Sequence, residues 1–156
     1  GSGGITEYFR ADGSTGDAIL YHYGSEKLKT QSTGVSVTGL LSATTKSFII
    51  DHPTKPNHKL RYGSLEGPEN GVYVRGRLKG GNVIELPDYW KGLVHEDSIT
   101  VELTAIGKHQ KLYVEDFDNT KVIVGNDNLM SKEINCFYTV YGERKDVDKL
   151  EVEYED

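Results

Sequence analysis

One short stretch of the chain contains the residue types of a nucleophilic catalytic set. Asp51 and His52 are adjacent, and Ser64 follows them. A serine hydrolase needs a carboxylate that orients a histidine, which in turn activates the serine. Adjacent residues of a strand point to opposite faces, so Asp51 is poorly placed to orient His52. Ser64 also lacks the Gly-x-Ser-x-Gly context of a nucleophile elbow. We therefore expect the histidines to make local hydrogen bonds, and we assign no catalytic residue and no enzymatic activity.

Metal and cofactor sites have equally weak signals. His52 and His58 flank two prolines, and neither His-x-His nor His-Glu-x-x-His occurs. The single cysteine, Cys136, excludes an intrachain disulfide and a multi-cysteine metal site, and its strand context favours a buried thiol over a nucleophile. The glycines of residues 76–81 lack Gly-Lys-Ser/Thr and precede a strand, which predicts a hairpin turn. No cofactor or metal ligand is assigned, although one histidine per chain on an oligomer axis stays open.

Two adjacent aromatic residues are the candidate ligand contact. Tyr89 and Trp90 could stack on a sugar ring if they were exposed. They also lie in residues 87–94, the best helix candidate, where the only tryptophan would more simply anchor a short helix in the core. Both interpretations are kept at this stage.

Composition excludes several partner classes. The 156 residues have a net charge of −6, which argues against nucleic acid and anionic membrane surfaces, because both require a positive patch. No apolar run approaches 18 residues, so we expect no membrane insertion. Only 36% of the residues are hydrophobic, and these include ten tyrosines, so core-forming residues are scarce. Gly1-Ser2-Gly3-Gly4 is typical of a cloning remnant, and on that interpretation we expect this chain to be a piece of a longer protein.

Residues 5–45 have the pattern of short strands joined by tight turns. Short runs that contain β-branched and aromatic residues are separated by turns rich in glycine, serine and aspartate, and no proline occurs. Such a segment buries little apolar area by itself, so it requires a partner surface, either the following domain or copies of itself. Self-association around an axis is the favoured solution, because it also hides the exposed strand edges. The expected strands are 5–11, 18–23, 27–31 and 35–38.

Residues 46–156 contain all four prolines and a richer strand pattern. We expect a β-sandwich or meander with its own core, in which residues 79–82 form a hairpin loop. The acidic end from residue 143 is expected to be exposed, although its apolar residues could dock as a strand or short helix. The expected strands are 46–51, 59–62, 72–78, 83–86, 98–106, 111–117, 121–125 and 135–142.

The second segment resembles a C-terminal module of tailed-bacteriophage tail fibre-like virion proteins. The resemblance is carried, in order, by residues 46–54, 59–73, 83–90, 103–107 and 141–147. Upstream, Phe-Arg-Ala-Asp-Gly-Ser at 9–14 is similar to the fibrous β shaft that precedes such modules. The resemblance implies a homotrimer whose terminal domain caps the shaft, assists trimer registration or contacts a host surface. It also implies an extracellular virion particle, assembled in the host cytoplasm.

These observations predict an all-β chain with a cloning remnant at 1–4, a trimeric intertwined β shaft at 5–45 and a β-sandwich-like terminal domain at 46–156. Partners would be two further copies of the chain and a cell-surface glycan or protein. A self-cleaving fibre chaperone is one alternative, although the Ser-Asp-x-Arg-Leu-Lys signature of that related family is absent. A carbohydrate-binding module is another. The residues expected at the trimer interface are Ile19, Tyr21, Val35 and Val37.

Overall fold

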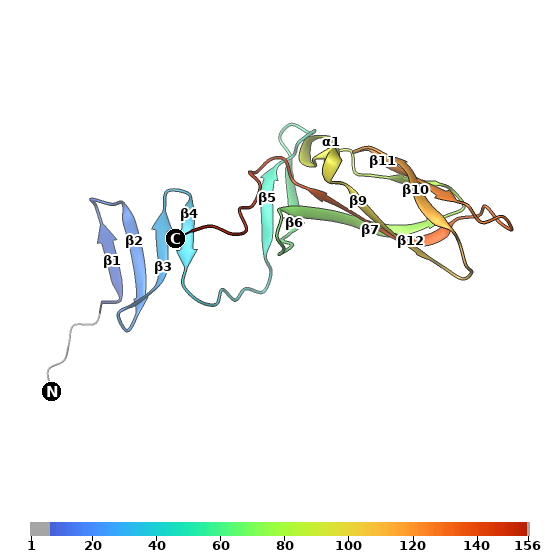
Figure 1. Ribbon diagram of the computed structural model, residues 1–156. Helices are drawn as coiled ribbons and strands as arrows, with labels where there is room; N and C mark the ends of the chain where they lie inside the picture. Colours follow the sequence, from blue (N-terminus) through green and yellow to red (C-terminus); the bar gives the residue numbers. More distant parts are fainter. Residues whose placement is uncertain (1–6, 156) are drawn as a thin grey trace. The chain divides into compact units, whose positions relative to one another are not determined.

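The computed structural model describes residues 7–155, and it is built almost entirely from antiparallel strands (Figure 1). Strands hold 48% of the residues and helices 5%, which confirms the expected all-β class. The chain divides into two compact units, Gly1–Thr45 and Lys46–Asp156, which are described separately. The residues interpreted as a cloning remnant, 1–4, lie outside the described residues. No helix in the described part is long and apolar enough to cross a membrane.

The first unit is a four-stranded sheet in which neighbours along the chain pair in the order β1-β2-β3-β4. Its turns follow from the sequence: Tyr23 and Gly24 both have positive φ, 47° and 78°, as a two-residue type I′ hairpin turn requires. Among the described residues of this unit, only one apolar side chain, that of Ile19, is buried. The strands are β1 (Phe9–Asp12), β2 (Asp17–His22), β3 (Ser25–Gln31) and β4 (Gly34–Val37).

The second unit contains two three-stranded sheets and a hairpin. One sheet has the order β7-β12-β9, the other has the order β10-β11-β8, and β5 pairs with β6. The strands are β5 (Ser47–Asp51), β6 (Lys59–Gly63), β7 (Gly71–Lys79), β8 (Val83–Glu85), β9 (Thr100–Ala105), β10 (Leu112–Phe117), β11 (Lys121–Asn126) and β12 (Asn135–Glu143). Two short helices, α1 (Trp90–Leu93) and η1 (Glu96–Ser98), lie between β8 and β9.

The connection at residues 79–82 is not the expected hairpin. β7 pairs with β12, whereas β8 pairs with β11, so the turn carries the chain from one sheet to the other. The reason is burial: Leu78 before the turn and Ile84 after it belong to the same core, and each sheet supplies one of them. Direct pairing of β7 with β8 would leave this core without its second layer.

The core of the second unit lies between the two three-stranded sheets and is closed by α1. Thirteen buried apolar residues form it, and partly buried side chains of β5 and β6 pack against them. Trp90 in α1 is completely buried, and helix and sheet approach each other most closely at Gly142 in β12. A Cβ atom on Gly142 would lie 2.4 Å from Cγ1 of Val94 and 3.5 Å from the Trp90 ring. The thirteen residues are Val72, Leu78, Ile84, Leu86, Trp90, Leu93, Val94, Ile99, Val122, Val124, Ile134, Cys136 and Val140.

A glycine at position 142 is therefore required by packing. We expect Gly142→Ala to lower the free energy of unfolding by about 1–3 kcal/mol, the usual cost of overpacking a core. Gly63→Ala is the matched control, since Gly63 also lies in a strand and its Cβ would meet nothing within 4 Å. Urea titrations of both variants measure the difference. Equal midpoints for the two would contradict the close approach of α1 to β12.

Candidate functional site

The first candidate surface is one face of the N-terminal sheet. Cross-strand partners point to the same side of a sheet, and the register aligns Phe9 with Leu20, Leu20 with Leu28, and Leu28 with Val37. Phe9 is 60% exposed, Leu20 47% and Val37 38%, so the row is apolar and open. Neighbouring positions on the same side add smaller side chains. We call this set the apolar face: Phe9, Ala11, Ala18, Leu20, Leu28, Thr30, Val35 and Val37.

The opposite face of the same sheet is polar. Ile19 pairs there with Arg10 and Lys29, whose long side chains flank it and leave it only 2% exposed. Lys29 forms an ion pair with Asp17 at 3.0 Å, and the Arg10 guanidinium lies 5.9 Å from the centre of the Tyr21 ring. The charged side chains of Arg10 and Lys29 thus cover the one buried apolar residue of this face.

This register divides the four residues expected at the trimer interface between the two faces of the sheet. Val35 and Val37 lie on the apolar face, but Ile19 and Tyr21 lie on the polar face, so the four residues do not form one surface. Alternation along each strand was evident from the sequence, whereas the alignment of one strand with the next was not. Leu20, which the sequence analysis did not single out, replaces Ile19 at the centre of the open surface.

The structure also corrects the ligand contact expected at Trp90. Its side chain is completely buried, so the indole is the core anchor of α1 and offers no ring face to a sugar. Tyr89 is half-buried: its hydroxyl lies 2.9 Å from that of Tyr62, and its ring packs edge-on against His52. Burial, followed by the hydrogen bond to Tyr62, raises the pKa of Tyr89 well above its ordinary value.

The histidine loop has the local bonding that its sequence predicts. Nδ1 of His52 accepts hydrogen bonds from the backbone N–H of Thr54 and Lys55, at 3.3 and 3.1 Å. Asp51 forms an ion pair with Lys59 at 2.5 Å and does not orient His52. Ser64 lies at the other end of the β5–β6 hairpin, where its N–H bonds to the carbonyl of residue 46. These groups are not arranged as a catalytic set.

Residues 7–155 contain neither a cluster of metal-ligating side chains nor an exposed thiol. No three His, Cys, Asp or Glu side chains in this range come close enough together to hold an ion. Cys136 is completely buried, as its strand context predicted, and desolvation raises the pKa of its thiol.

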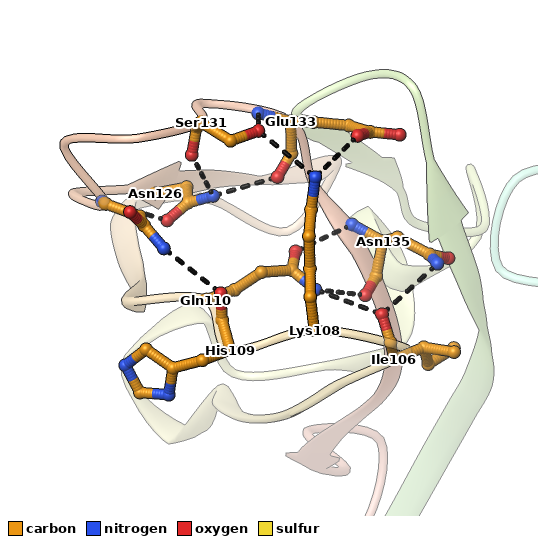
Figure 2. A network of polar contacts seen from close by, with 9 residues as sticks. Ile106, Lys108, His109, Gln110, Asn126, Ser131, Glu133 and Asn135 are labelled. Atoms are coloured by element: carbon orange, nitrogen blue, oxygen red, sulfur yellow. Dashed lines mark hydrogen bonds and ion pairs between the residues drawn. The ribbon is translucent and has the colours of Figure 1, made fainter.

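Two buried amides form a polar clamp that the sequence analysis did not anticipate (Figure 2). The side chain of Gln110 accepts a hydrogen bond from the N–H of Asn135 and donates one to its carbonyl, both at 2.8 Å. Asn126 donates to the carbonyls of Ser131 and Glu133, at 3.1 and 2.8 Å. Gln110 and Asn126 are each only 7% exposed. The clamp therefore holds the 106–111 loop and the 126–135 loop together.

The second candidate surface is the tip of the clamped 126–135 loop. Leu129 and Met130 are each 92% exposed, the highest exposures among the large apolar side chains of the described residues. The N–H of Met130 donates to Asn128 at 3.0 Å, which shapes the turn. The loop thus presents two adjacent apolar side chains from a base held by buried hydrogen bonds.

The C-terminal segment is anchored at its start. Arg144 forms two hydrogen bonds with the Asp146 carboxylate, at 2.9 and 2.7 Å, while its guanidinium lies 3.8 Å from the centre of the Phe48 ring. Lys149 pairs with Glu143 at 3.1 Å. Hydrogen bonding to Arg144 lowers the pKa of Asp146 below its ordinary value. Beyond these anchors, residues 150–155 are exposed and belong to no strand or helix.

Comparisons with known proteins identify no relative of this chain. No protein-family model matches it, and neither a curated protein nor a solved structure is significantly similar to it.

The Arg144–Asp146 pair predicts a pH dependence of stability. A carboxyl whose pKa is lowered by folding stabilises the protein above its unfolded pKa and loses this contribution as the pH falls through the folded value. Asp146→Asn should therefore lower the free energy of unfolding at pH 7 by about 1–3 kcal/mol, as expected for loss of a charge-assisted hydrogen bond. The difference from wild type should shrink below about pH 4, where the wild-type carboxyl is protonated as well.

Chemical denaturation at pH 7, 4 and 3 measures this effect. Asp127→Asn is the control, because the Asp127–Lys132 pair is 3.5 Å long and both of its side chains are exposed. A deficit of Asp146→Asn that stays constant with pH would show that the charge of Asp146 is not what stabilises the fold.

Proposed function

We propose that this chain is the C-terminal part of a homotrimeric, fibre-like structural protein of a bacteriophage virion. Residues 5–45 would form a short intertwined β shaft, and residues 46–156 a β-sandwich-like domain that caps it and assists registration of the trimer. The observation that carries the proposal is the open apolar face of the N-terminal sheet, where Leu20 is 47% and Val35 57% exposed.

Energetics support self-association of the first unit. Ordering a residue costs about 1–2 kcal/mol of backbone entropy, and a single-layer sheet offsets little of this cost by burial. Ile19 is the only buried apolar residue among the described residues of this unit. Three identical chains around an axis would each turn the same face inward, so that every apolar face covers another.

The architecture of the second unit supports the proposal that residues 46–156 form a β-sandwich-like terminal domain. Its two three-stranded sheets supply side chains to one common core, as the layers of a β-sandwich do. The exposed Leu129–Met130 tip is the surface we propose for contact with a cell-surface glycan or protein of the host. The Tyr89–Trp90 pair no longer supports a carbohydrate-binding module, because Trp90 is buried.

Substitutions on the two faces of the N-terminal sheet test the trimer. Leu20→Asp would bury a carboxylate in the interface, and the desolvation cost should convert the trimer to monomers at micromolar concentration. Ser36→Asp adds the same charge to the polar face, where Ser36 pairs with Lys29, and should leave the trimer intact. Sedimentation equilibrium measures both. A wild-type chain that sediments as a 17.4 kDa monomer would overturn the proposal.

A double substitution at the loop tip tests surface recognition. Leu129→Ser with Met130→Ser should weaken binding of the labelled protein to susceptible bacterial cells by at least tenfold, since apolar contact area is lost. The melting temperature should not change, because both side chains are exposed. Lys132→Ser in the same loop is the control. Undiminished cell binding by the double variant would exclude the tip as the contact surface.

A further inference from the structure

β7 is the edge strand of the β7-β12-β9 sheet, and one side of its nine residues has no strand partner among residues 7–155. The N–H of Gly80 donates to Ile134, and the carbonyl of Asn70 accepts from Arg144, so even-numbered residues direct their backbone groups toward β12. Alternate residues of a strand direct these groups to opposite sides. The N–H and C=O groups of Tyr73, Arg75 and Arg77 therefore point to the free edge.

Three odd-numbered residues of β7 also place positive charge on the outer face of the sheet. Arg75, Arg77 and Lys79 are exposed and recur at every second position, while Val72 and Leu78 point into the core. None of the three forms an ion pair within residues 7–155, and Arg77 bonds only to the neutral amide oxygen of Asn135. This is a concentrated positive row in a chain whose net charge is −6.

The C-terminal segment has the complementary pattern. Leu150, Val152 and Tyr154 alternate with Glu151, Glu153 and Glu155, which is the period of a half-buried strand. The three apolar side chains are nevertheless 49%, 60% and 73% exposed, and residues 150–155 belong to no sheet. Figure 1 shows the segment, coloured dark red, running away from β7 after its anchor near β5.

We propose that residues 150–155 of one copy add as a fourth strand to the free edge of β7 in a neighbouring copy. The glutamates would lie beside Arg75, Arg77 and Lys79, because opposed residues of paired strands share a face. Leu150, Val152 and Tyr154 would extend the inner, apolar side of the sheet beyond half-buried Val74. This strand exchange rests on the proposed self-association and identifies a second element that joins the copies.

The anchor of the segment lies beside the start of β7 of its own chain, so the segment could follow that strand only in the parallel sense, whereas a neighbouring copy can add it in the antiparallel sense, which pairs more stably. The side chain of Asn70 donates to the carbonyl of Asp148, and Lys149 is tied to Glu143, at 3.1 Å in each case. The six residues that follow are exposed and pair with no strand among the described residues, so the β7 edge is open to the segment of another copy.

Zero-length cross-linking tests both the contact and its partner. Full-length ¹⁴N- and ¹⁵N-labelled chains are mixed in denaturant, refolded together and treated with a carbodiimide, which joins a lysine amine to an adjacent carboxylate. We expect Lys79 to be linked to Glu151, Glu153 or Glu155, with mixed-isotope pairs among the products. If every Lys79 product carried a single isotope, the contact would lie within one chain and the proposal would be overturned, as it would be by the absence of any Lys79 link.

Charge reversal tests the complementarity without fixing the register. Arg75→Glu with Arg77→Glu should weaken self-association at least tenfold, and so should Glu151→Arg with Glu153→Arg, whereas combining all four should restore it. Lys55→Glu with Lys111→Glu, both exposed and both outside the β7-β12-β9 sheet, is the control for total charge. Failure of the four-fold variant to recover association would overturn the pairing.

A chain that ends at Lys149 separates this inference from the proposed trimer. Its Arg75 and Arg77 amides should exchange with deuterium at least tenfold faster than in wild type, because the added strand no longer protects them. Unchanged exchange with an intact trimer would overturn strand addition and leave the shaft interface standing. A monomeric wild-type protein would instead overturn the trimer and, with it, the exchange between copies.

Discussion

Burial of apolar side chains is the constraint on which this structure depends. Thirteen of the fourteen buried apolar residues in the described part lie beyond residue 46, and Ile19 alone belongs to the first sheet. The second unit can therefore enclose its own core, with Trp90 packed against Gly142 at its centre. The described residues of the first unit form a single layer in which only Ile19 is buried, so its apolar face needs a covering layer, which the proposed trimer would supply.

Buried polar groups hold the parts that the apolar core does not reach. Gln110 and Asn126 replace missing strand pairing with side-chain hydrogen bonds to loop backbone, and this rigid base supports the exposed Leu129–Met130 tip. Arg144 holds the start of the C-terminal segment, because it pairs with Asp146 and stacks on Phe48. Because no buried side-chain polar atom in the described residues lacks a partner, these connections carry little desolvation penalty.

Two surfaces of this chain are suited to contacts with other copies: the apolar face of the first sheet and the free edge of β7. Within residues 7–155, the side chains of the apolar face are largely exposed, whereas the free edge of β7 has no backbone partner and its Arg75, Arg77 and Lys79 form no ion pair. One requires a layer and the other a strand, and a homo-oligomer can supply both from identical chains. The charges of Arg75 and Arg77 are also what would discourage unspecific edge pairing, so the edge favours an acidic strand over a neutral one.

The sequence by itself determined the local structure: alternation around residues such as Val35 and Val101 predicted strands, and Pro87 to Val94 predicted the single helical turn. It also predicted a buried Cys136 and a histidine loop without catalytic geometry. Only the tertiary structure decided the pairing. β8 pairs with β11 instead of β7, Ile19 and Val35 lie on opposite faces of the first sheet, and Trp90 is buried in the core. Periodicity reports which residues of one strand share a side, but the register between strands depends on side chains distant in the chain.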